Sequence, residues 1–279
     1  MFIKQLPASL PNFAYLTMNF GIAAILLTIV FWKKIREIKR STILKSGLLG
    51  LILTANILFD KLGIDRLPSF MCSVFAASAI LIVPMIMICL RKYPTRNNIV
   101  GAVIIMSGIL LTNGFDVSNL FSVGAFFMLM SALLASIYTI VADKITKEED
   151  PILLTMLQMW LSALVSFIIW FREDPMTFAS IEYSNSMLSS IFICSFFGKA
   201  YAYVALMMAQ KYSDPIHITI ISSTEPVVTL VLAILIPSVF EEQFTWSAGL
   251  GAFIIMMGAI VSGTDFLTGK KKEILYETQ

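Results

Sequence analysis

Charged residues are scarce in this chain of 279 residues: Lys, Arg, Asp and Glu together make up 14%, whereas apolar residues make up 58%. A soluble domain needs more polar surface than this to cover its core, so the composition excludes a soluble globular protein. The apolar residues come in runs of about 17–25, the length at which a helix crosses the hydrocarbon core of a bilayer. The sequence therefore predicts an all-α integral membrane protein, because backbone groups at that depth must be satisfied within each segment.

Groups that carry chemistry are also few. The chain has one histidine and three cysteines, and Cys72, Cys89 and Cys194 all lie within apolar runs. An odd number of scattered thiols favours neither a disulfide framework nor a metal site. We find no phosphate-binding loop, no metal-ligand cluster and no nucleophile–base pair in the sequence, which argues against an enzyme, an ATP-driven pump and a bound cofactor. The basic residues sit in short loops beside the apolar runs, so no nucleic-acid surface is expected.

The apolar runs predict nine membrane-spanning helices. Pro11, Pro68, Pro151 and Pro215 each open a run, as expected for proline in the first turn of a helix. The predicted spans are approximately 12–32, 44–63, 68–90, 97–114, 121–142, 152–171, 187–210, 215–238 and 246–264.

Charge is sorted strongly between the loops. Basic residues collect in alternate loops, at positions 33–40, 91–96, 144–147 and 211, and in the tail at 270–272. The opposite loops carry mostly acidic residues. The positive-inside rule makes the basic side cytoplasmic, so we expect a multi-pass protein of the bacterial inner membrane whose C-terminus is cytoplasmic.

The stretch 214–263 has a weaker copy at 66–114, half a chain earlier. Thr95, Gly101 and Gly108 reappear without a gap as Thr245, Gly251 and Gly258. The two copies lie five spans apart, an odd number, so the second copy must be inverted in the membrane relative to the first. The sequence therefore predicts two inverted five-helix repeats, 1–120 and 121–279, with the first helix of the first repeat missing. Inverted repeats are typical of alternating-access carriers.

Three segments make the chain resemble a known family. They are SVGAFFMLMSALLASIYTIVADKITKEEDPILLTMLQ (122–158), STEPVVTLVLAILIPSVFEE (223–242) and GAFIIMMGAIVSG (251–263). These resemble the small-residue helix that opens the second half, the Glu-Pro helix with its acidic turn, and the Gly-rich closing helix of EamA-like permeases in the drug/metabolite transporter superfamily. The resemblance implies two inverted five-helix repeats around a central cavity, and carriage of amino acids or other metabolites.

Ionisable residues inside a span are costly, and this makes Glu225 and Lys199 the first candidates for a substrate or coupling-ion site. Glu225 could accept a proton or pair with a substrate ammonium. Alternatively, it could cap the amides freed by a kink at Pro226. Lys199 could contact a substrate carboxylate or phosphate, or form an ion pair with Glu225; alternatively, its side chain extends to the nearer interface. Its counterpart in the first repeat is Ile52, so the repeat itself does not require a cation there.

Weaker candidates share faces or depths with these two residues. Tyr203 lies one helical turn beyond Lys199, and its counterpart in the first repeat is Asn56, so both repeats place a hydrogen-bonding side chain at matched depth. Aromatic residues at this spacing are also common in ordinary packing.

Three further polar residues complete the set of candidates. Ser222 lies three residues before Glu225 on the same helical face, although a serine often bonds back to its own helix. Trp160 and Asn19 are cavity candidates in matched second helices, since polar groups at membrane depth usually face the bundle interior.

The sequence as a whole favours a secondary transporter that moves a small polar metabolite, such as an amino acid or a related compound, through the lipid bilayer by alternating access. The alternative is a membrane scaffold or degenerate carrier that does not transport. Gly101, Gly108, Gly251 and Gly258 permit close helix contact and could support a homodimer.

Overall fold

A computed structural model describes residues 10–67, 72, 75–76, 78–91, 93–112, 122–173, 184–222, 224, 227–228, 231 and 246–263, and the regular structure in them is helical. Five helical runs are long and apolar enough to cross a membrane: Asn12–Val30, Arg40–Ile64, Val123–Thr146, Pro151–Glu173 and Met187–Tyr212. Their lengths of 19 to 26 residues correspond to about 28–39 Å, against about 30 Å of hydrocarbon. Shorter apolar helices lie at Ala79–Cys89, Arg96–Leu111 and Gly249–Ser262.

The chain divides into two compact units. Unit 1 comprises Met1–Cys72 and Asn119–Pro215, and unit 2 comprises Ser73–Ser118 and Ile216–Gln279. Each unit therefore combines segments from both predicted repeats, 1–120 and 121–279. The compact units do not coincide with the predicted repeats, because helices from the two halves of the chain pack against each other within each unit.

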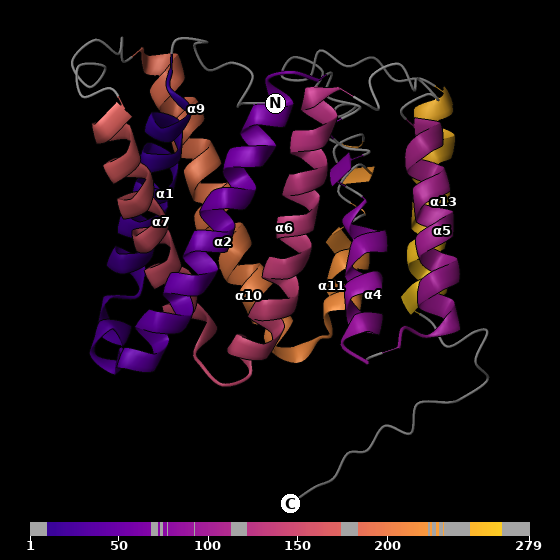
Figure 1. The fold of residues 1–279 in the computed structure, drawn as a ribbon, viewed down its shortest axis with the longest axis horizontal. Helices are drawn as coiled ribbons and strands as arrows, with labels where there is room; N and C mark the ends of the chain where they lie inside the picture. The colour runs from indigo at the N-terminus through magenta and orange to yellow at the C-terminus, as the bar shows by residue number, and fades with distance from the viewer. Residues whose placement is uncertain are drawn as a thin grey trace, which may run out of the picture. The chain divides into compact units, whose positions relative to one another are not determined.

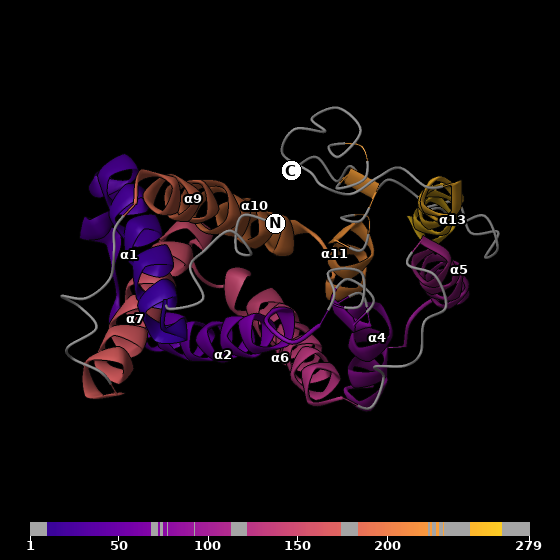
Figure 2. The ribbon, with the colours of Figure 1, turned by 90° about the horizontal axis from the view of Figure 1, so that it is seen from above.

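Unit 1 holds the five long helical runs. Its elements are α1 (Asn12–Val30), η2 (Trp32–Glu37), α2 (Arg40–Ile64), α6 (Val123–Thr146), α7 (Pro151–Glu173), α9 (Asn185–Ser195), η3 (Phe196–Tyr201) and α10 (Ala202–Tyr212). Helix α1 packs along α7, and α2 packs against both α6 and α7 (Figures 1 and 2). Helix α10 contacts α6 and α7, while α9 and η3 contact α1. Helix α7 thus links α1, α2 and α10.

Local sequence explains where several of these helices begin. Helix α7 begins at Pro151, as predicted, and the carboxylate of Asp150 accepts hydrogen bonds from the backbone N–H groups of Ile152 (2.8 Å) and Leu153 (3.1 Å). Ser122 caps α6 and Ser184 caps α9 in the same way, each through its hydroxyl. A side-chain oxygen before the first turn satisfies N–H groups that have no partner within the helix, which fixes the helix start.

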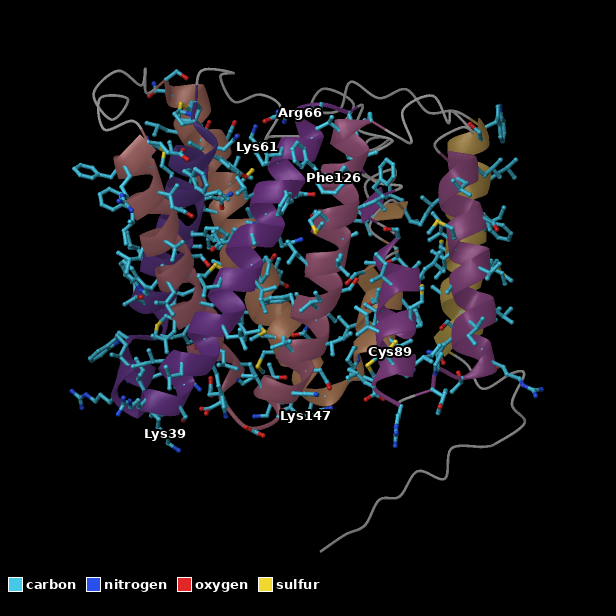
Figure 3. The ribbon with its side chains drawn as sticks, viewed as in Figure 1. Lys39, Lys61, Arg66, Cys89, Phe126 and Lys147 are labelled. Carbon is cyan, nitrogen blue, oxygen red and sulfur yellow. The ribbon has the colours of Figure 1, made fainter. Side chains whose placement is uncertain are left out.

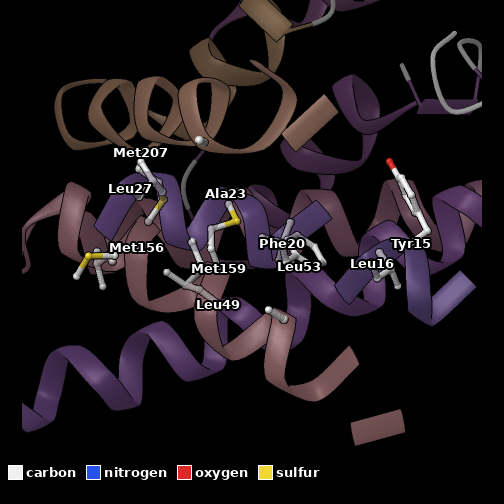
Figure 4. Packing of buried hydrophobic residues seen from close by; sticks show 14 of the residues in the cluster. Tyr15, Leu16, Phe20, Ala23, Leu27, Leu49, Leu53, Met156, Met159 and Met207 are labelled. Atoms are coloured by element: carbon white, nitrogen blue, oxygen red, sulfur yellow. The ribbon is translucent and has the colours of Figure 1, made fainter. Parts of the chain in front are cut away.

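The core of unit 1 is built from buried apolar side chains of α1, α2, α6, α7, α9, η3 and α10. Leu16, Phe20, Ala23 and Leu27 of α1 face Leu49 and Leu53 of α2, Met156 and Met159 of α7, and Met207 of α10 (Figure 4). Phe20 and Met159 are fully buried, whereas many other apolar side chains, such as Phe126 and Phe171, are exposed. An apolar interior together with an apolar exterior is expected for helices that meet lipid on their outer faces.

Unit 2 contains α4 (Ala79–Cys89), α5 (Arg96–Thr112), α11 (Pro215–Ser222) and α13 (Trp246–Gly263). Helices α5 and α13 lie side by side along their length (Figures 1 and 2). Helix α11 begins at the predicted Pro215, but the rest of the predicted span 215–238 lies mostly outside the described residues, as does the beginning of the span 68–90.

Glycines set the distance between α5 and α13. A Cβ atom added to Gly101 would lie 2.7 Å from the backbone oxygen of Gly258, and one added to Gly108 would lie 2.8 Å from that of Gly251. The two helices are therefore antiparallel. The contact is also reciprocal, because Gly251 and Gly258 are the predicted repeat counterparts of Gly101 and Gly108. Exchanging the two copies reproduces the contact, which is the relation an inverted repeat requires; the repeat across the whole chain stays a prediction.

Candidate functional site

Lys199 lies in the middle of the run Met187–Tyr212, within the π-helical segment η3. The segment reads FFGKAY and interrupts the regular α-helix between α9 and α10. Single π-helical turns are rare within α-helices and occur frequently at functional sites. The sequence predicts one uninterrupted helix here, so the change in helix type is a feature that only the structure reveals.

The ammonium group of Lys199 lies over two aromatic rings. Its Nζ atom is 5.6 Å from the ring centroid of Phe20 on α1 and 5.2 Å from that of Tyr203 on α10. Phe20 is fully buried and Tyr203 is partly buried. The structure therefore brings together Lys199 and Tyr203, as their spacing predicts, and adds Phe20 from a helix some 180 residues earlier in the chain. Both rings present negative electrostatic potential to the cation.

A carboxylate also acts on this cation. Asp60, near the end of α2, attracts the Lys199 ammonium electrostatically. Asp60 lies inside the predicted span 44–63 but is not among the candidates from the sequence, and its neighbour Lys61 forms an ion pair with Asp65 one turn later. Asp60 is thus a residue of the candidate site that sequence reasoning misses, and the only available signal is a carboxylate inside a predicted span. None of the ion pairs seen among the described residues involves Lys199.

Asn19 lies on α1 next to Phe20 and is only 1% exposed. Its Nδ2 atom donates a hydrogen bond to the hydroxyl of Tyr15 (2.7 Å) within the same helix. Its Oδ1 atom has no hydrogen-bond partner among the described residues. Asn19 therefore lies in the bundle interior and keeps an acceptor available there.

The side chain of Asn56 is hydrogen-bonded to the neighbouring helix α6. Its Nδ2 atom donates to the backbone oxygen (2.8 Å) and to the hydroxyl oxygen (3.0 Å) of Ser131 on α6. The side chain is 8% exposed. This arrangement is the interhelical hydrogen bond that polar residues form at membrane depth. Contact with substrate stays a prediction for Asn56.

Trp160 lies on α7 with its ring 43% exposed. Its Nε1 atom donates to the hydroxyl of Thr28 on α1 (2.9 Å), and that hydroxyl in turn donates to the backbone oxygen of Ala24 (2.7 Å). The indole thus ties α7 to α1. Its predicted role in a cavity is not tested by this arrangement.

The remaining predicted residues belong to unit 2. Ser222 is the last residue of α11 and its side chain is exposed. Glu225 and Pro226 lie outside the described residues, so the predicted ion pair between Lys199 and Glu225 stays a prediction.

A second set of charges joins η2 and the first turns of α2 to the turn between α6 and α7. Lys34 pairs with Asp150, and Lys45 pairs with Glu148 (2.7 Å) and Glu149 (3.0 Å), all at the turn between α6 and α7. Lys39 and Lys147 lie at this end of unit 1, whereas Lys61 and Arg66 lie at the other end (Figure 3). The turn belongs to the loops that the sequence predicts to be cytoplasmic.

Two carboxylates of this turn, Glu149 and Asp150, are held in their charged form. The Thr42 hydroxyl donates to Glu149 (2.7 Å), and this bond, with help from Lys45, keeps the pKa of the Glu149 carboxyl below its ordinary value. Burial raises the pKa of Asp150, but the ammonium of Lys34 and backbone N–H groups at the start of α7 outweigh it, so that pKa is also lowered. No group of His, Cys, Asp and Glu able to hold a metal ion occurs among the described residues.

Comparison with known proteins decides the family. The model of the EamA-like transporter family matches residues 1–114 and 122–264. The chain belongs to the EamA-like transporter family. It is therefore a multi-pass integral membrane protein from a family of transporters rather than of enzymes. Its fold is similar to that of a crystallised protein, with a TM-score of 0.72 and 16% sequence identity over 91% of this chain and 88% of that chain. No curated protein matches the sequence.

Proposed function

We propose that this EamA-like transporter carries a small polar metabolite, such as an amino acid or a related compound, by alternating access, and that the substrate binds at Lys199. The observation that carries this proposal is the Lys199 ammonium in the middle of a membrane-crossing run, over the rings of Phe20 and Tyr203. Phe20 comes from the first predicted repeat, and Lys199 and Tyr203 come from the second. A group between two repeats is well placed to be reached from either side in turn.

Energetic magnitudes favour a ligand for this cation. Placing a lysine at the centre of a membrane helix costs about 2.5–3.5 kcal/mol on insertion scales. A cation–π contact contributes about 0.5–2 kcal/mol, so contacts to two rings offset much of this cost. Neither contact is a hydrogen bond, so the ammonium still has N–H donors with which to bind an anionic group. Binding of a substrate carboxylate at Lys199 follows from this chemistry.

The nearby carboxylate supports a zwitterionic substrate. Asp60 acts on Lys199 through space, so the interior of unit 1 offers charges of both signs. A substrate with a carboxylate and an ammonium matches such a pair, whereas a simple anion would be repelled by Asp60. The buried Oδ1 of Asn19, on the same helix as Phe20, is an additional acceptor for a substrate N–H group.

Transport by the purified protein in liposomes tests the proposal. We expect uptake of one or more members of an amino-acid panel, and we expect Lys199→Met to abolish it while the protein still assembles. Lys211→Met, at the end of the same helical run, is the matched control and should transport normally. Tyr203→Phe keeps the ring face and should retain most activity, whereas Tyr203→Leu removes it and should not.

Three further results bear on the mechanism. Glu225→Gln should impair transport if the predicted pair with Lys199 forms during the cycle. Normal transport in Lys199→Met would remove Lys199 from the mechanism. Absence of uptake for every panel member by the intact protein, with assembly preserved, would favour the scaffold alternative.

A further inference from the structure

A group of buried polar side chains lies between α6, α7 and α10, toward the turn that joins α6 to α7. The hydroxyl of Tyr138 on α6 donates to Oε1 of Gln158 on α7 (3.1 Å) and lies 3.5 Å from the sulfur of Met207 on α10. Gln210 lies three residues after Met207, on the same face of α10. Gln158, Met207 and Gln210 are all 0% exposed. The group joins three helices of unit 1 and was not among the residues singled out from the sequence.

Three polar atoms of this group have unused hydrogen-bonding capacity. Nε2 of Gln158 and both Nε2 and Oε1 of Gln210 have no hydrogen-bond partner among the described residues. Exchanging the oxygen and nitrogen of the Gln158 amide leaves one atom unsatisfied in either case, because the Tyr138 hydroxyl can pair with whichever atom faces it. Buried amides without partners are rare in folded proteins, because each such atom costs about as much as a lost hydrogen bond.

The chemistry of these atoms selects the ligand. The group is neutral and presents donors from both amides together with an acceptor on Gln210. A metal cation would leave the N–H donors unsatisfied, and an anion would leave the acceptor unsatisfied and uncompensated. Water donates and accepts at the same time, and buried water typically makes about three hydrogen bonds to groups of this kind.

We propose that ordered water binds between α6, α7 and α10, bridging the side-chain amides of Gln158 and Gln210 beside the Tyr138 hydroxyl. This site is distinct from the proposed substrate site but adjoins it, because the ring of Tyr138 packs edge-to-face on that of Tyr203 with centroids 6.0 Å apart. Tyr203 in turn lies under the Lys199 ammonium. The water site therefore extends the polar interior from Lys199 toward the α6–α7 turn.

X-ray radiolytic labelling of the full-length protein in lipid nanodiscs tests this site directly, since hydroxyl radicals formed from bound water oxidise side chains beside it even when they are buried. Met207, against the Tyr138 hydroxyl, is the reporter. Met159 is the matched control: like Met207 it is 0% exposed and belongs to the core of unit 1 (Figure 4), but its sulfur has no hydrogen-bond contact among the described residues. We expect Met207 to be oxidised several-fold faster than Met159.

Two variants test whether water held by the two amides causes the oxidation of Met207. Gln210→Leu and Gln158→Leu remove the amides that hold the water, and each should lower Met207 oxidation toward the rate of Met159. Equal rates for Met207 and Met159 in the unaltered protein would overturn the proposal. So would faster oxidation of Met207 that persists unchanged in both variants, because the radicals would then come from elsewhere. Neither result depends on transport, so failure here is separable from failure of the proposed function.

Discussion

The helix pair α5–α13 in unit 2 and the pair α2–α6 in unit 1 are held together in different ways. In the first, glycines bring one helix against the backbone of the other, with Gly101 opposite Gly258 and Gly108 opposite Gly251. In the second, the side chain of Asn56 crosses to Ser131 and donates two hydrogen bonds. The α5–α13 contact depends on the absence of side chains at the glycines. The α2–α6 contact depends on hydrogen bonds, in which water or another polar group could replace either partner.

This difference separates structural helices from helices suited to a site. A glycine contact leaves no room for a side chain, so nothing between α5 and α13 at these positions can bind a solute. Unit 1 holds the partly buried Lys199 and the buried Asn19 and Gln210, which have polar atoms available to water or substrate. The four glycines also face each other within one chain, so the predicted homodimer would need another surface.

The largest expected effect comes from adding a methyl group to the glycine contact. In Gly258→Ala, the new Cβ would lie 2.7 Å from Ile105 Cγ1 and 2.9 Å from the backbone oxygen of Gly101. Backbone cannot yield without separating the helices, so we expect a loss of about 1–3 kcal/mol in the free energy of unfolding. Titration with denaturing detergent in mixed micelles measures this loss.

Two glycines of unit 1 are controls for that experiment. A Cβ added to Gly63 on α2 would meet the flexible end of the Met128 side chain, which can move, so Gly63→Ala should cost less than Gly258→Ala. Gly21 in the middle of α1 has no atom within 4 Å of the added Cβ, and Gly21→Ala should stabilise the helix by about 0.5–1 kcal/mol. Equal losses in all three variants would contradict the distinction between the two kinds of contact.

A smaller effect is expected when the polar contact of unit 1 is removed. Asn56→Leu eliminates both bonds to Ser131, and interhelical hydrogen bonds in membranes average about 0.6 kcal/mol with a maximum near 1.7 kcal/mol. Ser131→Ala removes only the bond to the hydroxyl and should cost less than Asn56→Leu. Unfolding of the two single variants and of the double variant gives the coupling between the side chains. A coupling of zero would show that the hydroxyl contributes nothing to the contact.

The sequence predicts the helices better than their partners. Pro151 and Pro215 predict helix starts correctly because proline in a first turn acts locally. The fixed register of Gly101 and Gly108 with Gly251 and Gly258 indicates close packing, but small residues do not identify the helix that approaches. That identity comes only from the tertiary structure.

The candidate site is predicted in part, for the same reason. Lys199 and Tyr203 share a face at local spacing, and the structure brings them together. Phe20 and Asp60 join the site through long-range packing, which leaves no mark on the sequence. The π-helical turn at Phe196–Tyr201 is equally hidden, because its apolar residues are compatible with an ordinary α-helix.

The smallest expected effect is the loss of stability on lowering the pH. We expect this loss in unit 1 but not in α5 and α13, since neither of these helices contains Asp or Glu. In the folded protein the pKa values of Glu149 and Asp150 lie below their ordinary values of 4.5 and 3.8. Carboxyls with lowered pKa values stabilise the fold above their ordinary values, and this stabilisation is lost as the pH falls through the folded values. These ion pairs are only partly buried and lie near the surface, where such pairs contribute about 0–1 kcal/mol each.

Hydrogen exchange between neutral pH and about pH 3, corrected for the intrinsic rate, should therefore show the amides at the α6–α7 turn losing protection while those of α5 and α13 keep theirs. Thr42→Val removes the leading cause of the lowered Glu149 pKa, so protection at the turn should begin to fall at a higher pH in that variant. Loss of protection at the same pH in both units would mean that the turn does not open on its own. The polar contacts of unit 1 would then open no more easily than the glycine contacts of unit 2. This result would contradict the distinction between hydrogen-bonded and glycine-based helix contacts.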